Sequence, residues 1–391
     1  MKEFSTSLKE KLKQMDYIIL SCAVALALLS ILVLWGGSNA FQGGKSKMTV
    51  QSIAAFAGLL LAFLIATVDY DALISKFELF FFIFSIVMLL SCIVINKFIP
   101  SISGSTGESN WNWIKVPGIP FYLQPAEFVK VTFIMTFSRH IDRVKDNINK
   151  IKNVGMLALH AGIILGLLAI TKDMGTVLVY MFIMASMLFA GGLSLWYFAA
   201  GAVILVILFP FVWDHMKEYQ KMRITVGFNP ELDPENYGYQ ALMSRKAIIA
   251  GGFRGAGLTG GKVFANIPAA HSDFLFAVLA EKLGFFGTFI YISIMAALII
   301  RLLIVSRRTR KDYASLICVG VAAVFIAQTL ENIGMCLATL PVVGIPLPFF
   351  SYGGSSMLSC FICIGLVESI CSHSKKYYFE RESASQSNIE E

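Results

Sequence analysis

Long apolar runs separated by short polar segments repeat along the whole chain. Runs of about 17 to 25 residues recur, which is the length that an α-helix needs to cross the hydrocarbon layer of a membrane. Backbone groups in lipid must be hydrogen-bonded within their own segment, so the spans are predicted to be helices. We predict ten spans, at residues 17–34, 50–68, 77–95, 124–140, 154–170, 177–190, 196–212, 274–303, 314–335 and 357–371.

One long polar segment, residues 214–273, interrupts this pattern between the seventh and eighth predicted helices and ends in Asp273. The polar ends of the chain, 1–16 and 372–391, are predicted to lie outside the membrane, and the second is expected to be disordered. The predicted fold is therefore an all-α polytopic membrane protein. Its ten-helix membrane domain spans residues 17–371 and includes one long extracytoplasmic loop.

Basic residues indicate which side of the membrane each connection occupies. The connector at 139–152 is rich in lysine and arginine. The short loops predicted on the other side hold few basic residues, namely Lys45, Lys47, Lys97, Lys115 and Lys172. The positive-inside rule then places both termini in the cytoplasm and segment 214–273 outside. The net charge of +7 is interpreted as topology, and nucleic-acid binding is not expected.

Composition narrows the class of protein further. With 57% hydrophobic residues, the chain carries more apolar surface than a soluble core of this size could bury. The seven cysteines lie in apolar segments without metal-like spacing, so neither disulfides nor a metal cluster is expected. The first apolar run is too long for the core of a signal peptide, and we expect it to be a retained anchor.

Asp273 is the residue where we place the chemistry. It stands at the mouth of the eighth predicted helix, where partial desolvation would raise the pKa of its carboxyl toward that of a general base. The alternative is a helix N-cap, a position that favours aspartate. His271 is interpreted as a proton shuttle or as a hydrogen-bonding neighbour of Asp273.

Polar residues inside the predicted spans form a second group of candidates. Glu127 and Lys130 are three residues apart and share one face of the fourth helix, where they either form an internal ion pair or line a cavity and contact an anionic substrate. Near the outer end of the ninth helix, Gln328, Glu331 and Asn332 are further polar groups at membrane depth.

Aromatic and basic residues outside the spans suggest contacts to a sugar-bearing lipid headgroup. Trp111 and Trp113 could stack on a sugar or could belong to the interfacial aromatic belt. The long segment carries positive charge where a phosphate would lie, at Arg223, Arg245, Lys246 and Arg254. Each of these basic residues could instead be a solvated side chain or an interfacial anchor.

A glycine run at 255–260 matches the letters of the dinucleotide fingerprint G-x-G-x-x-G. That motif binds nucleotide only between a strand and a helix of a βαβ unit. Here it follows a predicted surface helix at 239–250 on the outer side of the membrane. We therefore predict a flexible turn at this run.

The order of these motifs resembles the SEDS family (shape, elongation, division and sporulation), the RodA, FtsW and SpoVE group of cell-wall polymerases. The matching segments are Asn112-Trp113-Ile114, Gln124-Pro125-Ala126-Glu127-Phe128-Val129-Lys130, Asp173-Met174-Gly175-Thr176, Arg223, Gly238-Tyr239-Gln240, His271-Ser272-Asp273-Phe274-Leu275-Phe276, Gln328, Asn332-Ile333-Gly334-Met335, Gly344-Ile345-Pro346-Leu347-Pro348-Phe349 and Ser351-Tyr352-Gly353-Gly354-Ser355-Ser356.

This resemblance implies a peptidoglycan glycosyltransferase that extends glycan strands from lipid II on the outer face of the bacterial cytoplasmic membrane. The family's essential aspartate falls on Asp273, and two segments look more like the RodA branch than FtsW. Residues expected to contact the lipid II or the undecaprenyl diphosphate-linked glycan are Glu127, Lys130, Trp113, Arg223, His271, Gln328, Asn332 and Ser355. The leaving diphosphate is expected to be stabilised by basic residues or by a divalent cation.

The sequence also departs from the family pattern. The family commonly has arginine where this chain has Asn112, so an anion contact at that position is in doubt. It commonly has threonine at Ser272, a change that keeps the hydroxyl. The usual Gln-Pro-Asp turn reads Thr171-Lys172-Asp173.

Rival functions remain open at this point. One is a flippase for lipid-linked precursors, for which polar residues at membrane depth would serve. Another is a non-catalytic scaffold. The family further implies a class B penicillin-binding protein, a transpeptidase, as partner. This chain is not expected to crosslink peptides itself, since no Ser-x-x-Lys motif with its companion motifs is apparent in an outer domain. That partner would determine whether the chain acts in elongation, division or sporulation.

Overall fold

The computed structural model describes residues 13–41, 43–99, 103, 111–118 and 121–374. The disorder predicted for residues 372–391 is wrong for 372–374, which form the end of a helix, and the remainder of that prediction lies outside the described residues. Each of the ten predicted spans is a helix: α2 (Tyr17–Gly37), α3 (Gly44–Thr67), α4 (Tyr70–Phe98), α5 (Pro125–Val144), α6 (Ile151–Ile170), α7 (Met174–Ala190), α8 (Leu195–His215), α11 (Leu275–Arg308), α12 (Asp312–Cys336) and α13 (Gly354–Ser374). The all-α polytopic membrane fold is confirmed.

Two of these ten helices differ from the rest in composition or length. Within the described ranges, eight helices are both long and apolar enough to cross a membrane, and α5 and α7 fall outside this group. Helix α7 is apolar but has 17 residues. Helix α5 is more polar, yet it is buried on nearly every side from Pro125 to Ser138 because other helices surround it. Protein neighbours, and not lipid, therefore surround most of α5.

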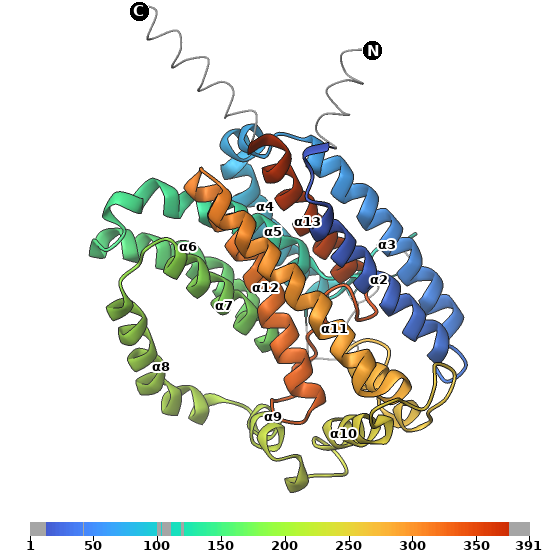
Figure 1. The fold of residues 1–391 in the computed structure, drawn as a ribbon. Helices are drawn as coiled ribbons and strands as arrows, with labels where there is room; N and C mark the ends of the chain where they lie inside the picture. The colour runs from blue at the N-terminus through green and yellow to red at the C-terminus, as the bar shows by residue number, and fades with distance from the viewer. Residues whose placement is uncertain (1–12, 42, 100–102, 104–110, 119–120, 375–391) are drawn as a thin grey trace, which may run out of the picture.

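Helices α12 and α13 form the packed centre of the bundle together with α5 (Figure 1). Helix α13 lies along α3, where two glycines permit close approach. A Cβ on Gly58 would come within 2.6 Å of the Phe361 ring, and one on Gly365 within 2.8 Å of the Ala62 backbone. Small residues at such crossings are how membrane helices pack without a hydrophobic driving force.

Helix α8 stands apart from this bundle, at the left of Figure 1. Most of its described side chains are exposed, with Val206 73% and Ile207 69% accessible. Near its start, Tyr197 and Phe198 are partly buried against the bundle. Pro210 lies inside the helix and removes one backbone hydrogen bond. Helix α8 therefore has few contacts with the bundle and leads directly into the long polar segment.

The long segment 214–273 is folded, not an open loop. It contains α9 (Glu218–Phe228), η2 (Pro230–Leu232), α10 (Tyr239–Gly251) and η3 (Val263–Asn266). The surface helix predicted at 239–250 is confirmed by α10, which packs on α11. In Figure 1, α9 and α10 lie at the end of the bundle opposite to the start of α2 and the end of α13.

The glycine run is a structural turn that the chain itself fills. Gly255 and Gly257 have positive φ, a conformation that suits glycine. Just beyond the run, the Glu281 carboxylate accepts three backbone N–H groups, from Lys262, Val263 and Phe264, at 2.7, 2.9 and 2.7 Å. These N–H groups, which could otherwise bind an anion, are therefore bonded to a side chain of α11. The predicted turn is confirmed.

Lys282 fastens the same turn to the first membrane helix. Its ammonium donates to the carbonyl oxygens of Gly36, Leu258 and Gly260, at 3.0, 2.9 and 3.1 Å. The side chain is 1% exposed, so this charge depends on those oxygens in place of water. Glu281 and Lys282 together fix the part of the segment that leads to Asp273.

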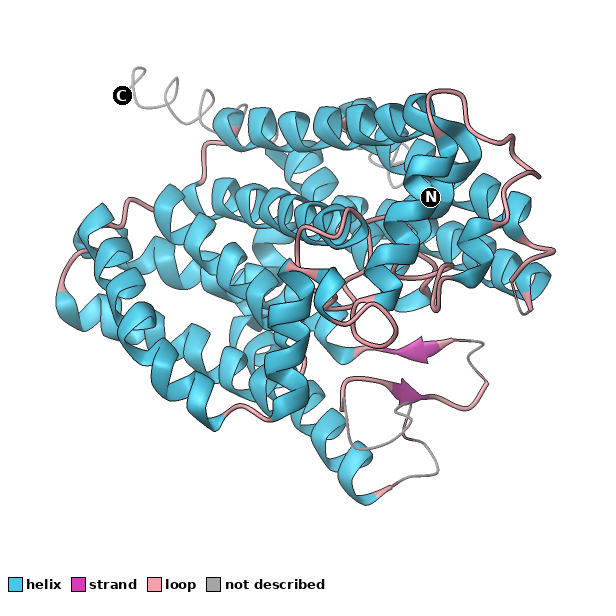
Figure 2. Cartoon of the chain, turned by 90° about the horizontal axis from the view of Figure 1, so that it is seen from below, coloured by secondary structure: helices cyan, strands magenta, loops and turns pink. Residues whose placement is uncertain are grey.

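A short antiparallel pair of strands lies at the same end of the bundle as α9 and α10 (Figure 2). Strands β1 (Ile114–Lys115) and β2 (Tyr122–Leu123) pair with Ile114 opposite Leu123. The register brings the residues before β1 beside Gln124, which follows β2 and precedes α5.

Candidate active site

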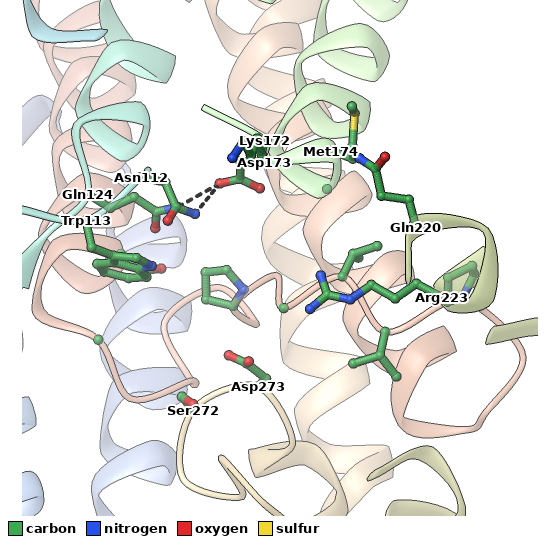
Figure 3. Close-up of a pocket in the computed structure, with 18 of the residues that line it drawn as sticks. Asn112, Trp113, Gln124, Lys172, Asp173, Met174, Gln220, Arg223, Ser272 and Asp273 are labelled. Atoms are coloured by element: carbon green, nitrogen blue, oxygen red, sulfur yellow. Dashed lines mark hydrogen bonds between the residues drawn. The ribbon is translucent and has the colours of Figure 1, made fainter. Parts of the chain in front are cut away.

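A cavity of about 330 Å³ opens where the long segment meets the membrane helices (Figure 3). Its wall is built from the residues flanking the two strands, the start of α7, one face of α9, the segment 341–346 and the Ser272-Asp273 turn. Segments far apart in sequence thus contribute to one polar site.

Asp273 lines this cavity directly before α11. The N-cap alternative is wrong, because Phe274 occupies that position and no side chain caps the helix. The backbone of Asp273 is held on both sides: its N–H donates to the Ala269 oxygen at 3.1 Å, and its carbonyl accepts from Asn332 Nδ2 at 2.8 Å. The carboxylate faces Gly344, where an added Cβ would lie 3.4 Å from Oδ2.

The environment of Asp273 suits a proton acceptor. Burial raises the pKa of its carboxyl to about 6, while a hydrogen bond from Ser272 lowers it and the charge of Asp173 raises it. A carboxyl with this pKa is ionised at neutral pH and still accepts a proton readily. The direction of this shift and its main cause are those expected from the sequence.

A second carboxylate, Asp173, faces the same cavity but is already engaged. Its Oδ1 accepts the N–H of Thr176 at 3.1 Å, which caps α7. Its Oδ2 accepts from Asn112 Nδ2 at 2.8 Å and from Gln124 Nε2 at 3.3 Å. Both oxygens of Asp173 are therefore used as hydrogen-bond acceptors within the protein, and we assign it a structural role.

Sequence reasoning missed Asp173 as a site residue. The local signal was present, because Asp173 precedes α7 and has Thr176 three residues later, a spacing typical of a capped helix start. Its partners Asn112 and Gln124 come from another part of the chain, and only the fold brings them to it.

Two cations belong to the cavity wall. Arg223 reaches it from α9, and Lys172 comes from the turn before α7. Lys172 has φ +64° and holds its ammonium 4.4 Å from the centre of the Trp111 ring. The other basic residues predicted on the long segment, Arg245, Lys246 and Arg254, do not line the cavity.

A second cavity of about 410 Å³ adjoins the first. The two share Arg223, Asp273 and Gly344, and the second is otherwise bordered by residues such as Tyr239 and Gln240 from α10. Asp273 therefore stands at the border of two hollows, with a cation beside it.

His271 is not the hydrogen-bonding neighbour of Asp273 that we expected. Its ring packs between Phe41 and Tyr352, with centroid distances of 5.9 and 5.5 Å. Burial, together with a smaller contribution from the charge of Lys47, lowers the pKa of His271 to about 4. The neutral ring packs against its two aromatic neighbours, so His271 has a packing role and does not hydrogen-bond to Asp273.

Glu127 and Lys130 form the internal ion pair that the sequence left as one alternative. Their charged atoms are 2.8 Å apart and both residues are 2% exposed. Ser359 donates to the other Glu127 oxygen at 2.7 Å. The pair does not line either cavity, and its substrate contact stays a prediction.

The remaining predicted residues divide between the cavity and its support. Trp113 lines the cavity. Asn332 bridges the carbonyls of Asp273 and Ile345, at 2.8 and 2.7 Å. Ser355 accepts from the backbone N–H of Gln124 at 3.1 Å and so holds the wall. Gln328 is buried in α12 away from the cavity lining.

These features define a class: a multi-pass helical membrane protein with a polar cavity that contains two carboxylates, Asp173 and Asp273, and two cations. The family model for the FtsW, RodA and SpoVE proteins, described as cell cycle protein, matches residues 13–376. The chain belongs to this family, as its motifs predicted.

Two relatives are similar over nearly the whole chain. A probable peptidoglycan glycosyltransferase FtsW from Trichlorobacter lovleyi is 30% identical over 368 residues, which are 92% of this chain and 94% of the relative. The peptidoglycan glycosyltransferase MrdB of Escherichia coli K12 is 31% identical over 365 residues, again 92% and 94%. The two identities are nearly equal, so the predicted preference for the RodA branch stays a prediction.

Solved structures share the fold. A chain from a peptidoglycan synthase complex that coordinates polymerization and crosslinking superposes with a TM-score of 0.78 at 27% identity, covering 92% of this chain and 98% of that one. The rod shape determining protein RodA of Thermus thermophilus gives a TM-score of 0.67 at 24% identity, with 92% and 97% covered.

Proposed function

We propose that this protein is a peptidoglycan glycosyltransferase that polymerises lipid II, with Asp273 as the general base. The 4-hydroxyl of the acceptor sugar attacks the anomeric carbon of a lipid-linked donor, and its proton passes to Asp273. The bond from that carbon to the diphosphate breaks, and undecaprenyl diphosphate leaves. The observation that carries the proposal is the Asp273 carboxylate, which lines the cavity with a raised pKa and without a capping role.

The two cations of the wall support the same chemistry. The leaving diphosphate gains negative charge as the bond breaks, and Arg223 and Lys172 offer positive charge in the same cavity. Among the described residues, no cluster of three or more histidine, cysteine or acidic side chains is arranged to hold a metal. Assistance by a divalent cation is a separate expectation that metal titration of the activity would test.

The comparisons support the substrate and suggest the partner. Both relatives are named as peptidoglycan glycosyltransferases, one of them as probable, and the solved complex joins polymerization to crosslinking. A class B penicillin-binding protein is the transpeptidase that would supply the second activity. We infer that the site faces the outside of the cytoplasmic membrane, because the basic connector 139–152 marks the inner side.

Polymerisation of lipid II by the purified protein in nanodiscs, with and without its transpeptidase partner, tests this function. We expect Asp273→Ala to lower the rate at least about 100-fold, the size of a general-base contribution. Asp214→Ala is the matched control, because this exposed aspartate at the start of the same segment does not line either cavity. A folded Asp273→Ala protein that polymerises as fast as the control would refute the proposed base.

The flippase alternative would depend on the charged pair at membrane depth. Because Glu127 and Lys130 bind each other and Ser359 within the protein core, the structure supports the polymerase over that alternative. Translocation of labelled lipid II in liposomes, measured beside glycan synthesis, separates the two. Translocation that persists in Asp273→Ala and is lost in Glu127→Gln would favour the flippase.

A further inference from the structure

Asn112 is a buried residue of the cavity wall. One polar atom of its side chain, Nδ2, has a hydrogen-bond partner, and the other, Oδ1, has none among the described residues. It directly precedes Trp113, lies beside the short strand pair, and is 8% exposed. In Figure 3, Asn112 and Gln124 lie with Asp173 on one side of the cavity, and Asp273 lies on the other. A group bound between the two sides would reach both Asn112 and the base.

The orientation of the Asn112 amide is determined by its neighbour. Its Nδ2 donates to Asp173 Oδ2 at 2.8 Å. A carboxylate can only accept hydrogen bonds, so the amide must present its NH₂ group to Asp173 and its oxygen elsewhere. The position of Oδ1 therefore follows from chemistry and does not depend on choosing between two similar amide orientations.

Asn112 Oδ1 is buried and has no hydrogen-bond partner within the described part of the chain. Of the residues with such an atom in the described part of the chain, Asn112 is the one that lines the cavity. Buried carbonyl oxygens are nearly always satisfied, because leaving one unpaired costs free energy. An unsatisfied acceptor in a substrate cavity is accordingly a position for a donor on the ligand.

The local charge indicates which kind of ligand group fits. The carbonyl oxygen of Asn112 can only accept a hydrogen bond and repels an anion. The diphosphate would therefore pair with the cations of the wall, Lys172 beside Asp173 and Arg223 on α9, and not with Asn112. A neutral N–H or O–H donor suits the Asn112 oxygen. The sugars of a peptidoglycan precursor carry both, as acetamido groups and hydroxyls.

We propose that Asn112 is a specificity-determining residue whose Oδ1 accepts a hydrogen bond from a sugar N–H or O–H of the bound substrate. This inference rests on the proposed function. Asp173 is a positioning residue, because its bond to Asn112 Nδ2 fixes the orientation of the Asn112 amide. Gln124 shares the same carboxylate oxygen, at 3.3 Å, but its own carbonyl oxygen is not among the unpaired atoms.

Gln124 therefore offers a matched control. Gln124→Ala removes one donor to Asp173, as Asn112→Ala does, but leaves the Asn112 acceptor in place. A purely structural role of Asn112 would give the two variants the same behaviour. A recognition role would make them differ in how they discriminate between substrates.

The experiment measures kcat/KM of the full-length protein in nanodiscs with lipid II and with two sets of analogues. One set carries an acetoxy group in place of an acetamido group, which removes the N–H, and the other lacks single sugar hydroxyls. We expect the natural substrate to be preferred about tenfold over one analogue, a typical effect of one buried hydrogen bond. Asn112→Ala abolishes this preference, whereas Gln124→Ala retains it.

The outcome also identifies the donor, because the discriminated analogue is the one that lacks it. Equal use of all analogues by the natural protein, or a preference that survives in Asn112→Ala, overturns the inference. If Asn112→Ala does not fold, Asn112→Ser carries the same test, because it keeps a small polar side chain and removes the amide oxygen. A natural protein that makes no glycan from lipid II would refute the proposed function itself.

Discussion

Helices α12 and α13 are buried within the protein, whereas the more apolar helix α8 is not. The apolar spans of α12 and α13 are 72% and 83% buried within the protein, whereas that of α8 is 0% buried. Helix α8 is nevertheless the most apolar of the three. In a membrane, lipid satisfies large apolar side chains, so protein–protein packing is marked by small and polar residues instead.

The candidate site has one part attached to the buried helices and another part that follows the exposed helix α8. Asp273 is attached to the packed half, because its backbone carbonyl is held by Asn332 of α12. Arg223 belongs to α9, which follows the exposed α8 in sequence. The base is thus held by the packed helix α12, whereas the cation is carried by the helix that follows the exposed α8, and each part should respond differently to substitution.

The largest expected effect comes from loosening the packed part. Asn332→Leu removes the hydrogen bonds to the carbonyls of Asp273 and Ile345, so the base shifts. We expect polymerisation to fall about 100-fold, the order of loss that follows a misplacement of about 1 Å. Leu330→Ala on the same helix is the control, since that side chain is 61% exposed. Equal rates in the two variants would contradict the interpretation that α12 holds the base.

The pH profile of polymerisation tests the state of the base itself. Asp273 must be ionised to accept a proton, and its pKa is about 6. The rate should therefore be constant above pH 7 and fall about tenfold for each pH unit below 6, because the ionised fraction falls in that proportion. A limb that instead breaks near pH 4 would show that the carboxyl has an ordinary pKa.

The same pKa gives a stability prediction. The folded-state pKa of Asp273 is raised from 3.8 to about 6, so the folded protein binds the proton more tightly than the unfolded chain. The stabilisation by the protonated form is complete below pH 4 and is lost as the pH rises through 6. Asp273→Asn should therefore stabilise the protein at pH 7 by about 2 to 3 kcal/mol and should have little effect at pH 4. Thermal unfolding at both pH values measures this, and a gain that is equal at both would contradict it.

A pair of glycine substitutions measures the packing difference directly. A Cβ on Gly58 of α3 meets Phe361 of α13 at 2.6 Å, whereas one on Gly201 of α8 meets nothing within 4 Å. We expect Gly58→Leu to destabilise the protein by about 1 to 3 kcal/mol through overpacking. Gly201→Leu should change stability by less than about 0.5 kcal/mol. Similar shifts in thermal unfolding for both variants would show that α8 is packed as tightly as α3.

Most of the fold could be predicted because the bilayer imposes a length and a composition on each span. The largest error at a helix start is in α3, which begins at Gly44, ahead of the predicted 50. Helix α4 begins at Tyr70, but its backbone is non-helical at Phe77, so the predicted start at 77 coincides with a kink. Polar residues such as Lys45 continue α3 beyond its apolar run, and a pattern of apolar residues does not reveal them.

The candidate site was predictable only in part. Asp273 and Arg223 were identified, since one stands at a membrane boundary and the other on a polar segment. The ring contacts of His271 with Phe41 and the bonds from Asn112 to Asp173 join residues far apart in sequence. The missing arginine at Asn112 suggested a lost anion contact, whereas the fold shows a donor to a carboxylate.

The shared border of the two cavities has a consequence for the kinetics. The Asp273 carboxylate lines two adjoining cavities. We therefore expect donor and acceptor to occupy one cavity each and both to be bound before the proton moves. The reaction should then follow a sequential order through a ternary complex, without a ping-pong exchange. Double-reciprocal plots at varied donor and acceptor should intersect, even though the two substrates are chemically almost the same.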